Sequence, residues 1–170
     1  MLKAIFTATA LVVSMTAFNP ARAEVVRYPT TGNPALMIVV PNGWTHKPLV
    51  SGSQPQTFLL TSPHHVEVAA IVLPNLATPE AFAQQISAFS HLQMRNQGPT
   101  PSLGAPGYMF DASFTNVAGE VINMHVIQAK IDKTHMALVE MRSPGKGTTA
   151  RELNEGKQIL ATLKLASPTQ

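Results

Sequence analysis

The order of apolar segments predicts an α+β protein in which one antiparallel sheet has helices packed on both of its faces, an α/β/α sandwich. Short apolar runs rich in β-branched residues recur along the chain, separated by turn residues, and only two segments have helical spacing. A hairpin predicted near the C-terminal end is apolar on both faces through its middle. Both faces of such a sheet must be buried against other elements of the fold.

The first 23 residues have the pattern of an export signal rather than of a folded segment. Lys3 precedes an apolar run over residues 4–18, and residues 21–23 (Ala-Arg-Ala) form a small-x-small cleavage site. The run is shorter than the roughly 20 residues that span a bilayer. We therefore expect a signal peptide over residues 1–23 and a single domain over residues 24–170.

Composition narrows the class of protein further. The first 23 residues hold two of the twelve basic residues and none of the nine acidic ones, so the formal net charge falls from +3 to +1 after cleavage. So small a charge gives no basic surface for nucleic acid or anionic lipid. The sequence has no cysteine, which excludes disulfides, thiolate metal sites and a lipidated cysteine. We expect a soluble periplasmic or secreted protein with no stable membrane anchor and no cofactor.

The first half of the mature chain is predicted to hold three strands. They are expected over residues 35–40, 57–61 and 66–73, because each is a short apolar run bounded by turn residues. Residues 24–33 are expected to hold at most a short strand. Residues 47–56, which contain proline, glycine and serine, are expected to form a loop.

A helix is predicted to follow these strands. Thr78 suits the N-cap, Pro79 the first helical position and Glu80 the positive end of the helix dipole. Helical spacing places three aromatic or aliphatic side chains on one face: Phe82, Ile86 and Phe89. The helix is expected to end near residues 96–98, and residues 99–107 are expected to form an irregular, proline-rich connection.

The second half is predicted to hold three strands and a helix. The strands are expected over residues 108–117, 121–131 and 134–142, the first with apolar and polar residues alternating. Thr149 and Glu152 have the spacing of a capping box, which predicts the start of the final helix. Gly156 lies inside that helix at a cost of about 1 kcal/mol relative to alanine, which indicates either close approach to a strand or tolerance of that cost.

Several of these segments resemble the PsbP/DcrB-like family, which groups photosynthetic PsbP proteins, the Ran-binding Mog import factor and the bacterial envelope protein DcrB. The resemblance rests on IVVPNGW over residues 38–44, TPEAF over residues 78–82 and the final amphipathic helix, and it covers most of the mature chain. It implies the sandwich fold and a role as an assembly factor, binding protein or chaperone for apolar segments, with no common catalytic residue. DcrB is a lipoprotein, whereas this sequence has no cysteine to carry a lipid.

Histidine is the metal-ligand residue type present in surplus, and it forms two groups with acidic residues. The first group is His64, His65 and Glu67, where the backbone enters a strand. Adjacent residues on an extended backbone point apart, so the simpler interpretation of this group is a solvated loop.

The second group lies in the predicted hairpin. If Asp132 and Lys133 form a two-residue turn, His125 lies directly opposite Glu140. This pair supplies two ligands, whereas tightly bound zinc usually needs three or four. We interpret it as a cross-strand pair that stabilises the sheet.

These patterns favour a non-catalytic binding or accessory module that acts on an envelope protein or an apolar peptide segment. The alternative is a metal-binding protein or metal-assisted hydrolase that uses a polar site drawn from one set of residues: His64, His65, Glu67, His125 and Glu140.

The export signal generates the first testable prediction. Protein recovered from outside the cytoplasm should begin at Glu24, because cleavage follows the small-x-small site. Mass spectrometry of the intact protein measures this directly. A mature form that retains residues 1–23 would contradict the prediction.

Overall fold

The computed structural model describes residues 23–28, 34–49, 57–74, 78–90, 92, 94–102 and 105–165. Of the expected signal peptide, only Ala23 lies within this part of the sequence. The elements in order are β1 (Glu24–Tyr28), β2 (Leu36–Val40), β3 (Thr45–Leu49), β4 (Thr57–Thr61), β5 (Glu67–Pro74), α1 (Pro79–Ser90), β6 (Arg95–Ser102), β7 (Ala105–Thr115), β8 (Val121–Lys130), β9 (His135–Pro144), α2 (Ala150–Thr162) and β10 (Lys164–Leu165).

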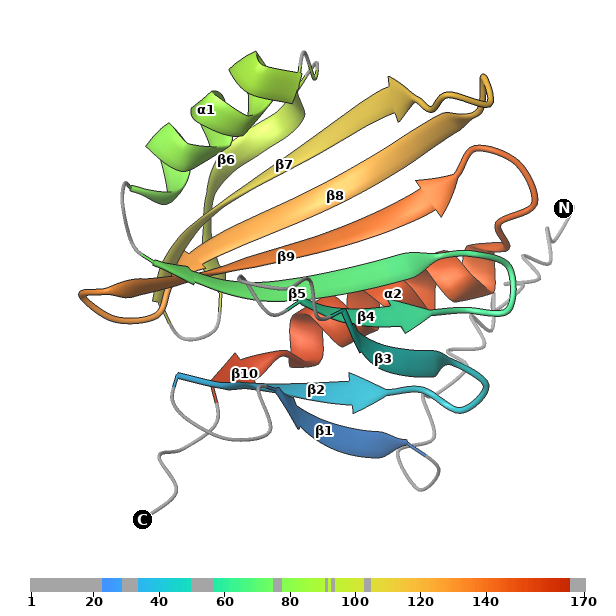
Figure 1. The fold of residues 1–170 in the computed structure, drawn as a ribbon, viewed down its shortest axis with the longest axis horizontal. Helices are drawn as coiled ribbons and strands as arrows, with labels where there is room; N and C mark the ends of the chain where they lie inside the picture. Colours follow the sequence, from blue (N-terminus) through green and yellow to red (C-terminus); the bar gives the residue numbers. More distant parts are fainter. Residues whose placement is uncertain are drawn as a thin grey trace, which may run out of the picture.

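The described strands form two antiparallel sheets, where the sequence predicts one (Figure 1). The large sheet has seven strands in the order β3-β4-β5-β9-β8-β7-β6. The small sheet has the order β1-β2-β10, so the first and last of the described strands pair with the same partner. Helix α2 contacts β2 as well as β5 and β9, and it therefore joins the two sheets.

Alternate side chains of β7 belong to two different layers of the molecule. Tyr108, Phe110 and Ala112 are buried and form an apolar cluster with Ala83 of α1. The alternate residue Asp111 instead lies in register with His125 of β8, which pairs with Met141 of β9. Met141 lies against α2.

Helix α2 packs on the larger of the two apolar clusters. This cluster joins side chains from both sheets and from α2: Tyr28, Leu36, Ile38, Val40, Trp44, Phe58, Leu60, Val66, Val68, Ala70, Ala137, Val139, Met141, Ile159, Leu160 and Leu163. A Cβ at Gly156 would lie 2.6 Å from Met141 Sδ, closer than real Cβ contacts allow. Gly156 thus lets the helix approach β9 closely, which confirms one of the two interpretations from the sequence.

Helix α1 begins where the sequence predicts. The Thr78 side chain accepts a hydrogen bond from the Ala81 N–H at 3.2 Å, as an N-cap residue does. Phe82 and Ile86 of α1 are half-buried, whereas the side chain of Phe89 lies outside the described residues. Helix α1 ends at Ser90, several residues before its predicted end.

Two strands occur where the sequence predicts irregular structure. β3 lies partly in the predicted loop, and β6 covers the predicted helix end and the first part of the predicted connection. Both are edge strands of the large sheet. Each contains proline, at Pro48 in β3 and at Pro99 and Pro101 in β6. An edge strand bonds to a neighbour on one side only, so a residue that lacks an N–H can be accommodated there.

The turn between β8 and β9 corrects the predicted hairpin register. The carboxylate of Asp132 accepts hydrogen bonds from the Thr134 and His135 N–H groups, and the Ile131 N–H donates to the His135 carbonyl. The turn therefore has three residues, one more than predicted. As a result His125 pairs with Met141, and Glu140 pairs with Val126.

Among the described residues, no helix combines the length and the apolar character needed to cross a membrane.

A pair of glycine variants tests the strand packing. A Cβ at Gly107 in β7 would lie 2.5 Å from the Gln128 carbonyl oxygen and 2.9 Å from that of Thr100, and neither backbone can move independently of its strand. Gly107→Ala should therefore lower the free energy of unfolding by about 1–3 kcal/mol. Gly98→Ala in β6 is the matched control, because a Cβ there meets nothing within 4 Å. Equal losses in denaturant unfolding would show that the two sites do not differ as described.

Candidate functional site

An open cleft of about 450 Å³ lies beside α2 on the large sheet. Its lining comes from β6, β7, β8 and β9 and from Leu153 and Lys157 of α2. The volume falls within the range of roughly 300–1,000 Å³ that is typical of ligand pockets. We take this cleft as the candidate functional site.

The floor of the cleft contains a row of residues aligned across four strands. Arg95 of β6 pairs with Asp111 of β7, which pairs with His125 of β8, which pairs with Met141 of β9. Directly paired residues of antiparallel strands project to the same face. The row therefore runs from an arginine at the sheet edge to the apolar cluster beneath α2.

A bulge in β6 brings two consecutive side chains to this face. The register of β6 against β7 shifts between Arg95 and Gly98, and Asn96 has a positive φ of 49°. In a regular strand, neighbouring side chains point to opposite faces. Here Arg95 Nη2 donates to Ser113 Oγ at 3.0 Å, and Asn96 Nδ2 donates to Asp111 Oδ2 at 2.8 Å. The bulge thus places a cation and an amide beside the same strand.

Asp111 and His125 form the shortest side-chain hydrogen bond of the site. His125 Nδ1 lies 2.6 Å from Asp111 Oδ1. Burial alone would raise the pKa of Asp111, but the hydrogen bonds from Asn96 and His125 and the positive charge of Lys157 outweigh burial and lower it. An ionised carboxylate only accepts hydrogen bonds, so His125 Nδ1 carries a proton and Nε2 is the ring nitrogen left for other contacts.

The next row of the floor is polar and uncharged. Ser113 pairs with Asn123, and Asn123 pairs with Ser143. Asn123 is exposed, whereas Ser143 is buried at 5% exposure and still lines the cleft. The floor therefore offers amide and hydroxyl groups beside the charged row.

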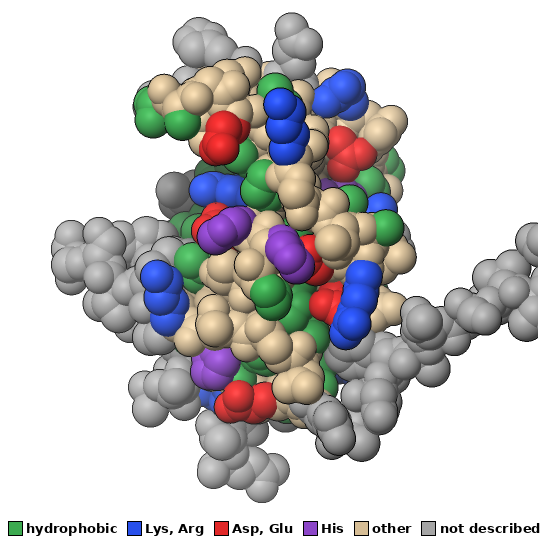
Figure 2. Space-filling model, turned by 90° about the vertical axis from the view of Figure 1, so that its right-hand side faces the viewer, with side chains coloured by type: hydrophobic (Ala, Val, Ile, Leu, Met, Phe, Trp, Pro, Cys, Tyr) green, Lys and Arg blue, Asp and Glu red, His purple; other side chains and the backbone are tan. Residues whose placement is uncertain are grey.

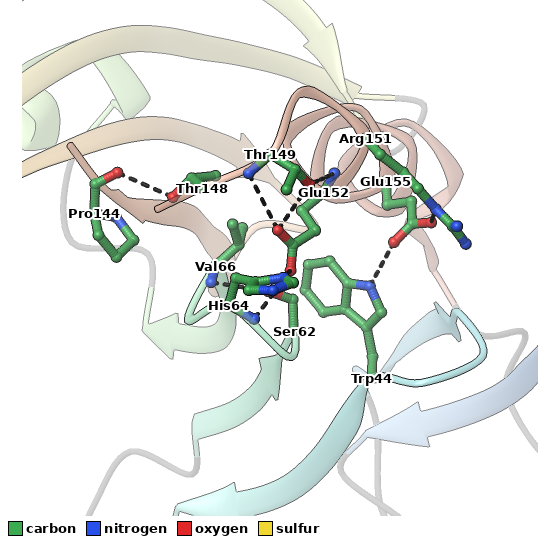
Figure 3. A network of polar contacts seen from close by, with 10 residues as sticks. All are labelled: Trp44, Ser62, His64, Val66, Pro144, Thr148, Thr149, Arg151, Glu152 and Glu155. Atoms are coloured by element: carbon green, nitrogen blue, oxygen red, sulfur yellow. Dashed lines mark hydrogen bonds and ion pairs between the residues drawn. The ribbon is translucent and has the colours of Figure 1, made fainter. Parts of the chain in front are cut away.

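A buried carboxylate fixes α2, and with it one wall of the cleft (Figure 3). Glu152, at 5% exposure, accepts from Thr149 Oγ1 at 2.8 Å and from the Thr149 N–H at 3.2 Å, which completes the capping box. It also accepts from the His64 N–H at 3.0 Å, contacts His64 Nδ1 at 2.9 Å and is hydrogen-bonded to Ser62. The N-terminus of α2 is thereby bound to the turn between β4 and β5.

The electrostatics of Glu152 follow from these contacts. Burial alone would raise its pKa, but the hydrogen bonds from Thr149, Ser62 and His64 overcome that effect and lower the pKa to about 2. The carboxylate is therefore ionised throughout the physiological pH range.

A second contact holds the same helix to the connection between β2 and β3. Trp44 Nε1 donates to Glu155 Oε2 at 2.9 Å, and Arg151 Nε donates to Glu155 Oε1 at 2.8 Å. Trp44 is buried at 7% exposure, so its ring joins the apolar cluster while its N–H reaches the helix. In Figure 3 the indole ring points from the connection between β2 and β3 toward α2.

Figure 2 shows the end of the molecule at which these turns meet. Histidine side chains lie near the middle of this face with acidic side chains beside them. The visible apolar side chains are scattered in small groups rather than joined in one patch. This view gives no sign of an extended apolar docking face.

The structure does not bring the five polar residues singled out in the sequence into one group, although Glu67 and Glu140 are close enough for their charges to interact. His64 contacts Glu152, and His65 is exposed with a φ of 66°. His125 lines the cleft, whereas Glu140 lies in register with Val126, which belongs to the α1 cluster, and forms an ion pair with Arg142. Within the described ranges, no three His, Asp or Glu side chains are grouped so as to hold a metal ion.

Glu140 has an unusual environment on the α1 side. Burial raises the pKa of Glu140, the ion pair with Arg142 opposes this increase, and the negative charge of Glu67 adds to the increase.

The predicted pairing of His125 with Glu140 is wrong. The extra residue in the turn places the two side chains on opposite faces of the sheet.

Sequence patterns identified His125 but not its partners. Asp111 was assigned to the polar face of a strand, and Arg95 and Asn96 were assigned to a helix end. Only the bulge in an edge strand, which leaves no periodic signal, brings these residues together. Glu152 was identified as a capping residue, but its contact with a turn 88 positions away has no local signature.

Comparison with solved structures finds proteins with a similar fold. The protein is similar to LpqN, involved in cell envelope biogenesis of Mycobacterium tuberculosis, with 13% identity and a TM-score of 0.56 over 85% of this chain and 91% of that one. It is also similar to cyanobacterial PsbP (CyanoP) from Synechocystis sp. PCC 6803, with 12% identity and a TM-score of 0.55 over 94% of this chain and 98% of that one. No protein-family model and no curated protein sequence matches. The protein has a PsbP-like fold, as the resemblance implies.

Glu152 generates a pH-dependent prediction. Its pKa is lowered from 4.5 to about 2, so it stabilises the fold above pH 4.5, and this contribution is lost as the pH falls toward 2. Glu152→Gln should lower the free energy of unfolding at pH 7 by roughly 1–3 kcal/mol, since the buried donors lose their charged acceptor.

Denaturant unfolding at a series of pH values measures this effect, and the difference between wild type and variant should shrink as the pH falls from 4.5 toward 2. Glu120→Gln is the control, because Glu120 is exposed in the turn between β7 and β8. A difference that stays constant with pH would show that the carboxylate charge is not the stabilising group.

Proposed function

We propose that the protein is an exported, non-catalytic binding module that holds a short segment of a partner polypeptide in the cleft beside α2. The observation that carries the proposal is the cleft itself, in which hydrogen-bonding side chains on a rigid sheet face an apolar residue, Leu153, on a helix fixed at its N-terminus. Amide and hydroxyl groups such as those of Asn123 and Ser143 match the donors and acceptors of a peptide backbone.

The arrangement supports binding more directly than turnover. His125 is oriented by Asp111, as an acid–base group would be, but no hydrogen bond joins it to Ser143 within the described residues. A nucleophile that is activated by a base normally lies within hydrogen-bond reach of it. The cleft has the groups needed to recognise a segment and lacks a formed nucleophile–base pair among those residues.

The edge strands of the large sheet are poorly suited to pairing with a strand of a partner protein, which favours the cleft as the binding site. An added strand needs N–H and C=O groups along the free edge. Pro99 and Pro101 of β6 have no N–H to contribute, and Pro48 has none in β3. Proline on an edge strand is a common means of preventing such pairing.

The proposed location and architecture rest on further observations. A role outside the cytoplasm is supported by the export pattern of residues 1–23 and agrees with the involvement of LpqN in cell envelope biogenesis. We include in the proposal that α1 and α2 cover opposite faces of the large sheet as a partial α/β/α sandwich. The alternating residues Phe110 and Asp111 of β7, which lie in the α1 cluster and in the cleft, support this.

Site-specific photo-crosslinking tests the proposal. A photoreactive amino acid at Asn123, which is exposed in the cleft, should give a discrete cross-linked protein product in the native envelope. The same group at Lys130 is the matched control, because Lys130 is exposed on the same strand outside the cleft. No product at Asn123, or the same product at both positions, would contradict a binding role for the cleft.

A further inference from the structure

The cleft carries positive charge that its own carboxylate does not neutralise. Its charged lining consists of Arg95, Lys157 and Asp111, with His125 as a further titratable group. The charge of residues 24–170 is close to balanced, so this excess is local. A local excess of one sign attracts a ligand group of the opposite sign.

The single carboxylate is already occupied. Asp111 accepts hydrogen bonds from Asn96 at 2.8 Å and from His125 at 2.6 Å, one on each oxygen. Lys157 acts on Asp111 only through space, since no hydrogen bond or ion pair within the described residues includes it. The ammonium group of Lys157 therefore keeps its three donors for another acceptor.

The arginine is oriented but not neutralised. Arg95 Nη2 donates to Ser113 Oγ, a neutral acceptor, and no carboxylate pairs with the guanidinium within the described residues. A guanidinium has five N–H donors, so one hydrogen bond leaves most of them available. Arg95 belongs to the edge strand of the sheet and Lys157 to the helix, so the two cations of the cleft come from different elements.

We propose that the cleft recognises a carboxylate of the bound segment, held by Lys157 and Arg95, with an adjacent apolar side chain against Leu153. The inference rests on the proposed binding function and adds the chemistry of the anchor. The carboxylate belongs to an acidic side chain or to the C-terminus of the partner polypeptide, which share the same donor requirement. Asn96 and Asn123 line the same cleft, and their side-chain amides have N–H groups that can donate to neighbouring peptide groups.

Matched peptides test the anchor with the purified mature protein. The first probe is acetyl-Ala-Leu-Ala-Leu with a free C-terminal carboxylate, the second is the same peptide amidated, and the third is amidated acetyl-Ala-Leu-Glu-Leu. Inorganic phosphate is a fourth probe. Side-chain amide signals of Asn96 and Asn123 in NMR titrations report on binding in the cleft.

The expected result is that the first or third probe shifts these signals more strongly than the amidated neutral peptide. Lys157→Met or Arg95→Met should then weaken binding by about tenfold, the loss of one modest charge-assisted hydrogen bond. Lys130→Met removes a cation outside the cleft and should leave binding unchanged. Unfolding curves confirm that each variant is folded, and whichever of the two charged peptides binds identifies the source of the carboxylate.

Three results would overturn the inference. Equal binding of the charged and neutral peptides, unaffected by Lys157→Met, would leave a segment-binding cleft without a carboxylate anchor. Binding of phosphate alone would assign the cations to a phosphate group instead. If none of the four probes binds, the inferred carboxylate anchor is wrong. The proposed binding function is tested separately by cross-linking at Asn123.

Discussion

The buried carboxylate of Glu152 is the interaction on which the arrangement of this molecule depends. One side chain satisfies the first turn of α2 through Thr149 and at the same time accepts hydrogen bonds from the turn between β4 and β5. A helix N-terminus has backbone N–H groups without partners in the helix, and its dipole favours negative charge. Glu152 meets both requirements with a single group, and so the helix start and the strand turn are positioned together.

The position of α2 in turn determines both the core and the cleft. One side of the helix buries Ile159 and Leu160 in the larger cluster, with Gly156 permitting close contact with Met141. Leu153, which also packs against this cluster, and Lys157 line the cleft. A shift of the helix would change the core packing and the shape of the cleft together. The contact of Trp44 with Glu155 adds a second fixed point, from the connection between β2 and β3.

Most regular elements could be predicted because their signals are local. Strands β2, β4 and β5 are short apolar runs, and both helices begin at capping residues, Thr78 and Thr149, as expected. The short strand β10 was not predicted, and neither were β3 and β6. The last two lie at sheet edges, where pairing on one side outweighs the poor strand propensity of proline. Each pairs with the strand that follows it in the sequence, but THKPL and RNQGPTPS have neither an apolar run nor an apolar–polar alternation that would indicate a strand.

The candidate site was less predictable because it depends on register and on irregular backbone. The extra residue in the turn at Asp132 separates His125 from Glu140, and the bulge at Asn96 brings that side chain to Asp111. Each change involves a single residue, yet each decides which face a side chain occupies. Because successive side chains of a strand point to opposite faces, a shift of one residue moves a side chain to the other face of the sheet. Such a shift leaves the composition of the strand almost unchanged.

The bulged edge strand also affects how such a protein can change over evolutionary time. Arg95 and Asn96 are exposed and belong to neither apolar cluster, although both contribute to the cleft wall. Substitutions at exposed positions outside the core usually change stability by less than about 0.5 kcal/mol. Under the proposed binding function, the chemistry of the cleft can therefore diversify at these two positions while the scaffold stays constant.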